Sequence, residues 1–171
     1  MKVKVKGSGT TVDLQQRDFI AKGGEGSIYG KGDTAYKIYE DRSKMIPMAK
    51  IQELAELRHP NIIAPQSLLL DGRNNTVGYT MRLLKDTYAL CQLFTKSFKQ
   101  RNGVAPDKMV ELVKKLRELI DYVHSKNCLV VDLNEMNFLA DKKLTELYAI
   151  DVNSYQTPSF PATAIMDSVR D

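Results

Sequence analysis

The sequence predicts an α+β fold in which a small β-rich part, residues 1–83, precedes a mainly helical part, residues 84–171. Two observations lead to this prediction. Before residue 84, short apolar runs alternate with glycine-containing turns, a pattern typical of antiparallel strands. After residue 84, apolar residues recur at spacings of three and four from Met109 to Val123, a pattern typical of a long amphipathic helix.

The β-rich part is expected to contain short strands and a single helix. The strands are predicted from runs of apolar and β-branched residues, two of them around a glycine turn, and lie in residues 1–6, 19–30, 34–40, 68–70 and 77–83. The helix is predicted over residues 47–58, because Pro47 suits an early helical position and apolar residues share one face. A connector near residues 83–86 then leads into the helical part.

The helical part is expected to begin with a helix over residues 87–98, and Gly103 lies in the break that follows it. Pro106 opens the longest predicted helix. Short strands are predicted beyond this helix, in residues 129–132, 137–140 and 144–150. Residues 157–171 have little periodicity, so a loop or a weak helix is expected there.

Bulk composition is that of an ordinary globular protein, with 43% hydrophobic and 27% charged residues, a balance that supports one packed core. The formal charge of +4 is too small and too dispersed to indicate nucleic-acid binding. Cys91 and Cys128 lie far apart in sequence, which argues against a zinc site or a disulfide scaffold and favours a reducing, cytoplasmic location. No apolar run approaches the ~18 residues needed to cross a membrane.

Several polar residues could carry chemistry, and each also has a plainer interpretation. The glycine turn in residues 21–30 could hold phosphates, although taken alone it fits a simple hairpin turn better. Lys37 lies inside an apolar strand, where it could bind phosphate oxygens or face solvent. Asp132 and Asn137 could act as a base and a metal ligand, or could cap a turn. Asp151 ends an apolar run and could be a Mg²⁺ ligand or a turn residue.

The order of these features resembles that of the protein kinase superfamily. The resemblance extends from Phe19 to Gln156 and includes HPNI at residues 59–62 and the pattern D-x-x-x-x-N from Asp132 to Asn137. The sequence DVNSYQ that begins at Asp151 is also similar to a segment of some bacterial and phage kinase-like proteins. The resemblance implies a eukaryotic-type kinase-like fold with a minimal large lobe.

By this resemblance the chain would bind ATP and Mg²⁺. Asp132 would be the catalytic base, and Lys37 would contact the α and β phosphates. The family's partner glutamate for this lysine falls at Lys50, and Glu53, one helical turn on, could take its place. Asn137 and Asp151 would hold Mg²⁺. The remaining nucleotide-binding positions would be the glycines of the turn and the residues around the adenine, namely Gly23, Gly24, Gly26, Ile28, Ala35, Met81, Leu83 and Leu139.

Some positions depart from the family pattern. Val131 stands where the catalytic loop has arginine, and Asn134 stands where it has lysine. The sequence also reaches Asp171 without the central helix of the large lobe, so the apolar stripe of residues 109–123 would lack its usual cover. We expect this stripe to be covered by the tail from Pro158 to Val169, by a second copy of the chain, or by a partner protein.

Two functions remain open on the sequence alone. The chain could be a protein kinase that transfers the γ-phosphate to a protein Ser or Thr, or to itself. It could instead be a pseudokinase that binds a nucleotide or a partner with little phosphotransfer. A pure interaction module accounts poorly for the polar residues at the family positions. The expected partners are a protein substrate or partner protein and a second copy of the chain in a homodimer, without nucleic acid or membrane.

Overall fold

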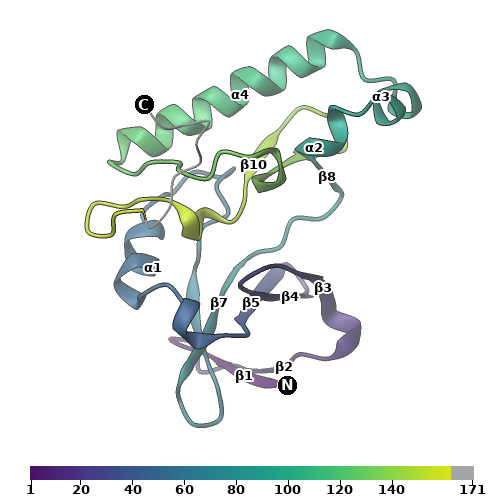
Figure 1. Ribbon diagram of the computed structural model, residues 1–171. Helices are drawn as coiled ribbons and strands as arrows, with labels where there is room; N and C mark the ends of the chain where they lie inside the picture. The colour runs from purple at the N-terminus through teal and green to yellow at the C-terminus, as the bar shows by residue number, and fades with distance from the viewer. Residues whose placement is uncertain (163–171) are drawn as a thin grey trace. The chain divides into compact units, whose positions relative to one another are not determined.

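A computed structural model describes residues 1–162, which form a mixed α+β structure, as expected (Figure 1). The chain divides into two compact units. The first comprises residues 1–55 and 65–84, and the second comprises residues 56–64 and those from Lys85 onward. The short segment 56–64 thus groups with the second unit although it precedes two strands of the first.

The first unit is built on a seven-stranded antiparallel sheet with the strand order β2-β1-β6-β7-β5-β4-β3. The strands that the sequence predicts in this unit are all present, and β2 is an additional one. Their bounds are β1 (Lys2–Val5), β2 (Thr11–Asp13), β3 (Phe19–Lys22), β4 (Gly26–Lys31), β5 (Thr34–Tyr39), β6 (Ser67–Leu70) and β7 (Thr76–Arg82). Short 3₁₀ helices, η1 (Gln16–Asp18) and η2 (Arg42–Lys44), lie in the connections.

Both faces of this sheet carry apolar clusters, because side chains alternate along β5. Tyr36 and Ile38 belong to a cluster on one face, whose other buried members are Val3, Leu14, Leu69 and Val77. Tyr39 belongs to a second cluster, on the face that also carries Lys37, together with Ile51, Leu68 and Tyr79. Ile51 comes from α1 (Met48–Leu54), so this helix covers the second face.

Helix α1 is shorter than the predicted range of residues 47–58. It ends at Leu54, and the following residues leave the sheet to join the second unit. There Ile62 forms a parallel bridge with Ala149, and Leu57 is buried. Packing of this segment against another part of the chain therefore overrides the helical pattern of its sequence.

The second unit contains the longest helix, α4 (Pro106–Ser125), and a three-stranded antiparallel sheet with the order β10-β9-β8 (Figure 1). Its other elements are β8 (Thr87–Ala89), α2 (Leu90–Leu93), α3 (Lys96–Asn102), η3 (Glu135–Asn137), β9 (Phe138–Asp141), β10 (Leu147–Ala149) and η4 (Val152–Ser154).

The single helix predicted over residues 87–98 is wrong. Residues 87–89 pair with β9, Ala89 lying opposite Leu139, and a new helix, α3, begins after Thr95. The Thr95 hydroxyl accepts a hydrogen bond from the Phe98 N–H at 3.3 Å, which is the usual cap of a helix start. The strand predicted over residues 129–132 is also wrong, because Leu129 forms only an isolated bridge with Gln156.

The apolar stripe of α4 is partly covered within the second unit itself. Leu112, Leu119 and Val123 are buried, whereas Val110 and Val113 are 55% and 58% exposed. The residues of the expected covering tail beyond Ala162 lie outside the described part of the chain. A cover from a second copy or a partner stays a prediction. No helix within residues 1–162 combines the length and the apolarity that a membrane span needs.

Candidate functional site

The glycine turn between β3 and β4 is closed by a hydrogen bond from the Gly23 N–H to the Gly26 carbonyl at 2.9 Å. Gly26 lies opposite Tyr39 in the β4–β5 ladder, and a Cβ atom there would lie 2.1 Å from the Ile38 carbonyl oxygen. Only glycine fits that position without displacing backbone. A Cβ atom added at Gly24 would have no other atom within 4 Å, so the space beside this residue is open.

Lys37 lies on a buried sheet face and not in solvent, since it is only 5% exposed. Its ammonium group donates to Glu25 Oε2 at 2.6 Å. It also lies 5.3 Å from the ring centroid of Tyr39 and 5.9 Å from that of Tyr79, within the range of cation–π attraction. The solvent-facing interpretation of Lys37 is therefore excluded, and its position suits binding of an anion.

Strand register places the expected adenine-contacting residues of this unit on the same sheet face as Lys37. Ile28 lies directly opposite Lys37 in the β4–β5 ladder. Ala35 precedes Lys37 by two residues and lies opposite Met81 in the β5–β7 ladder. Leu83 follows β7, and its N–H donates to the Asp33 carbonyl at 2.9 Å. The structure therefore brings together the apolar residues that the sequence assigns to this unit.

Glu53, the residue expected to pair with Lys37, lies on α1, which packs on this face through Ile51. The carboxylate that contacts Lys37 at 2.6 Å is that of Glu25, in the glycine turn. The pairing of Glu53 with Lys37 stays a prediction. Sequence reasoning missed Glu25, although it is the one acidic residue within the glycine turn of residues 21–30.

In the second unit, Asp132 is held by the side-chain amides of two asparagines. Asn134 Nδ2 donates to one carboxylate oxygen of Asp132 at 2.8 Å, and Asn137 Nδ2 donates to the other at 2.8 Å. Asn137 also donates to the Asp132 carbonyl at 3.0 Å. Because its Nδ2 points to Asp132, the Asn137 Oδ1 atom is directed elsewhere and can accept from a ligand or coordinate a cation.

The sequence predicts that Asn137 opens a strand. In the structure Asn137 ends the 3₁₀ helix η3, and β9 begins at the next residue. Asn134 caps this helix by accepting from the Met136 N–H at 2.9 Å. The turn is short and bonded at both ends, so the asparagine and aspartate side chains have defined positions.

Strand pairing brings Asp151 next to this loop. In the β9–β10 ladder Phe138 lies opposite Ala149, and the Ile150 N–H donates to the Asn137 carbonyl at 2.9 Å. Asp151 follows at once and adopts the left-handed conformation, with φ of 54° and ψ of 36°. That conformation is uncommon for residues other than glycine and is tolerated better by Asp and Asn than by most others.

Tyr155 is a further member of this group of residues. Burial, and next the negative charges of Asp151 and Asp132, raise the pKa of Tyr155 far above its usual value. The carboxylates of Asp151 and Asp132 are therefore both close enough to influence the charge of the Tyr155 phenol, and Tyr155 is 2% exposed. The bridge between Leu129 and Gln156 brings the segment after Asp151 alongside the segment before Asp132.

The donor set fits Mg²⁺ better than a transition metal. Asn137 and Asp151 offer oxygen atoms, and Mg²⁺ usually binds through one or two protein oxygens plus phosphate oxygens and water. Within residues 1–162, no three His, Cys, Asp or Glu side chains gather into a metal site. Leu139, the expected floor of the adenine site, lies two residues after Asn137 in β9.

Comparisons with models of known protein families and with curated protein sequences find no match for this chain. The contacts described above must therefore support any function by themselves.

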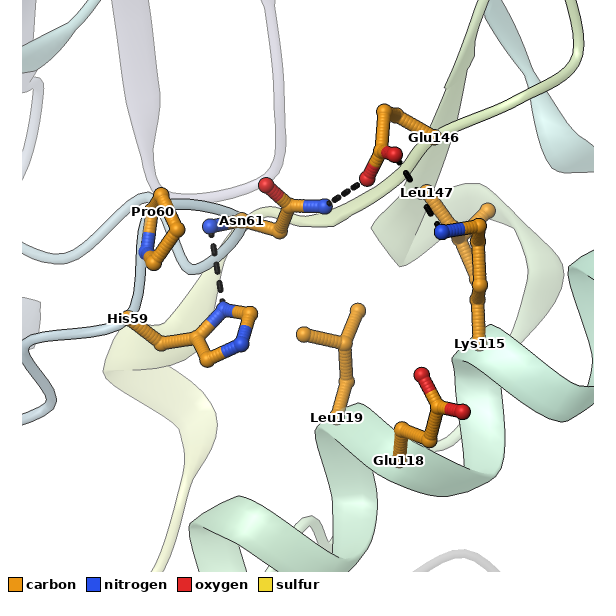
Figure 2. A pocket seen from close by; sticks show the side chains of 8 residues that line it. All are labelled: His59, Pro60, Asn61, Lys115, Glu118, Leu119, Glu146 and Leu147. Carbon is orange, nitrogen blue, oxygen red and sulfur yellow. Dashed lines mark hydrogen bonds and ion pairs between the residues drawn. The ribbon is translucent and has the colours of Figure 1, made fainter.

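A separate cavity of about 220 Å³ lies in the second unit between residues 59–61, α4 and β10 (Figure 2). Glu146 links its walls, since it accepts from Asn61 Nδ2 at 2.6 Å and from Lys115 Nζ at 3.2 Å. The His59 ring faces the cavity, and its Nδ1 accepts from the Asn61 N–H at 3.1 Å. These contacts join the segment 56–64 to the rest of the unit, so the cavity is first a structural junction.

Proposed function

We propose that this chain is a protein kinase-like protein that binds ATP and Mg²⁺ and transfers the γ-phosphate to a hydroxyl group of a protein, which can be another copy of itself. The observation that carries the proposal is the arrangement around Asp132, in which Asn137 and Asp151 are brought together by the β9–β10 pairing. The buried position of Lys37 supports it, because a nucleotide needs a cation for its phosphates.

Each residue set would have a distinct task. Lys37 would donate to phosphate oxygens, and the face that carries Ile28 and Ala35 would contact the adenine. Asn137 and Asp151 would hold Mg²⁺, which when bound neutralises charge on the phosphates.

Asp132 would act on the protein acceptor. Its carboxylate would take the proton of the acceptor hydroxyl while that oxygen bonds to the γ-phosphorus. The bond between the γ-phosphorus and the bridging oxygen breaks in the same process, and ADP leaves. The amides of Asn134 and Asn137 fix the orientation of the carboxylate, which lowers the entropic cost of reaching the reactive geometry.

A second candidate, a pseudokinase that binds the nucleotide with little transfer, is favoured by two observations in the same loop. Both carboxylate oxygens of Asp132 already accept hydrogen bonds from asparagine amides, so an acceptor hydroxyl would have to share the carboxylate with them. Asn134, a neutral residue, stands where the family has a lysine that would neutralise the γ-phosphate.

The decisive experiment measures thermal unfolding with and without Mg²⁺-ATP in wild type, Lys37→Ala and Asp151→Ala. At 100 times its Kd a ligand stabilises a protein by about 2.7 kcal/mol, so a clear upward shift is expected for wild type. Both variants should lose the shift, because each removes a side chain to which the proposal assigns a contact with Mg²⁺-ATP. Lys4→Ala and Asp121→Asn are matched controls, since both residues are exposed and belong to neither residue set.

Phosphate transfer is followed with γ-labelled ATP in wild type and in Asp132→Asn. Label on the wild-type protein or an added acceptor, absent in Asp132→Asn although the thermal shift remains, would support the enzyme. A shift without any label would support the pseudokinase. No shift in wild type, or a shift retained in both Lys37→Ala and Asp151→Ala, would refute nucleotide binding at these residues.

A further inference from the structure

The glycine turn places a carboxylate on the ammonium group that the proposed function assigns to phosphates. Glu25 Oε2 lies 2.6 Å from Lys37 Nζ. The Lys37 side chain is 7% exposed and that of Glu25 is 40% exposed, so the carboxylate approaches the lysine from the more solvent-exposed side. The backbone of the turn is fixed beside β5, because the Glu40 N–H donates to the Glu25 carbonyl at 3.2 Å.

A negatively charged group at this position stabilises the resting protein. A buried ammonium group loses much of its hydration, and a close anion offsets that cost. The neighbouring rings of Tyr39 and Tyr79 offer weaker attraction than a carboxylate in direct contact. Phosphate oxygens have the same charge and the same need for an N–H donor as the Glu25 carboxylate.

We infer that Glu25 is an internal competitor that occupies the phosphate position at Lys37 and must be displaced when a nucleotide binds. The inference rests on the proposed function and adds a regulatory contact to it. The Glu25 side chain is 40% exposed and the space beside Gly24 is open, so the carboxylate can rotate away from Lys37 while the Glu25 backbone stays bonded to Glu40. The equilibrium between Glu25 in contact with Lys37 and Glu25 displaced from it would then set the apparent affinity for the nucleotide.

The test compares Mg²⁺-ATP affinity, by titration calorimetry on the full chain, in wild type, Glu25→Gln and Glu40→Gln. Glu40 is the matched control, because it directly follows β5 next to the glycine turn, and its carboxylate contacts Lys22 at 2.8 Å and Ser27 at 3.3 Å. Both variants remove one negative charge, but only in Glu25→Gln does the lost charge lie in direct contact with Lys37. We expect Glu25→Gln to tighten binding by about 5-fold or more, at the lower end of typical coupling effects. Glu40→Gln should change it less than about 2-fold, as expected for screened surface charge.

A second measurement does not depend on the nucleotide. Mild acetylation followed by mass spectrometry gives the labelling rate of Lys37 relative to Lys2 and Lys4 in the same sample. Glu25→Gln should raise this ratio several-fold, and Glu40→Gln should leave it unchanged.

The outcomes separate the two ideas. Equal affinities in the two variants, or weaker binding by Glu25→Gln, would overturn the competitor role while leaving nucleotide binding intact. Absence of nucleotide binding in all three proteins, with the labelling ratio raised in Glu25→Gln, would confirm the contact but refute the proposed function and the competitor role with it. Circular dichroism of each variant verifies that the sheet is folded.

Discussion

A single methyl group added to the glycine turn should have opposite consequences at two positions two residues apart. In Gly26→Ala the new Cβ would lie 2.1 Å from the Ile38 carbonyl oxygen and 2.9 Å from the Tyr39 Cα, both of them backbone atoms of β5. Backbone in the middle of a seven-stranded sheet cannot withdraw without lengthening ladder hydrogen bonds. In Gly24→Ala the new Cβ would meet nothing within 4 Å.

The expected magnitude for Gly26→Ala follows from the cost of overpacking, about 1–3 kcal/mol. For a chain of this length each kcal/mol lowers the melting temperature by about 2–4 °C, so a loss of roughly 2–12 °C is expected. Gly24→Ala should be neutral or stabilising by up to about 1 kcal/mol, because alanine reduces the entropy of the unfolded chain.

The assay is thermal unfolding followed by circular dichroism, without nucleotide, so that only the fold is measured. An unchanged melting temperature for Gly26→Ala would refute the close packing of β4 on β5 as described. An equal loss in both variants would show that the whole turn, and not the contact with Ile38, responds to the substitution.

Two further predictions concern stability. Glu146→Ala should lower the free energy of unfolding by about 1 kcal/mol, because Glu146 joins Asn61 and Lys115 across the cavity at a partly exposed position. Urea unfolding should detect this loss, and Glu118→Ala, at an exposed cavity residue that forms no such link within residues 1–162, should be neutral. Hydrogen bonds from the Asn75 N–H, then from the Asn75 side chain and Arg42, hold the pKa of Asp71 well below its ordinary value. A depressed folded-state pKa stabilises the protein above about pH 4 and this contribution is lost as the pH falls further, so the stability difference between wild type and Asp71→Asn should narrow between about pH 4 and pH 2. A difference that is constant across that pH range would contradict the role of Asp71.

The sequence predicts the strands of the first unit well because period-two alternation reports burial directly. In residues 34–40 this alternation places Tyr36 and Ile38 on one face of the sheet and Lys37 on the other, and the apolar clusters on the two faces confirm this. It does not predict which carboxylate reaches Lys37, because the direction of a side chain in a glycine turn has no sequence period. Glu25 was therefore found only from its distance to the lysine.

Pairing between distant segments explains the predictions that were wrong. Residues 87–89 have an acceptable helical sequence, yet they complete an open edge of β9 as a third strand. Likewise, the spacing of Asp132 and Asn137 indicates one loop, but the approach of Asp151 depends on the β9–β10 ladder. Local propensity is a weak preference of at most ~1 kcal/mol per ordinary residue, and long-range strand pairing can exceed it.

The connectivity of residues 56–64 has a consequence for how the protein can be divided. The Ala149 N–H donates to the Asn61 carbonyl at 2.8 Å, and the Ala149 carbonyl accepts from the Ile63 N–H at 2.9 Å. The segment 56–64 therefore pairs with an edge of β10. A fragment that starts at Lys85 would lack that peptide and expose unpaired amide groups, a known cause of self-association. Separate production of the two halves should therefore succeed only by complementation, for instance when a synthetic peptide spanning residues 56–64 is added to the carboxy-terminal fragment.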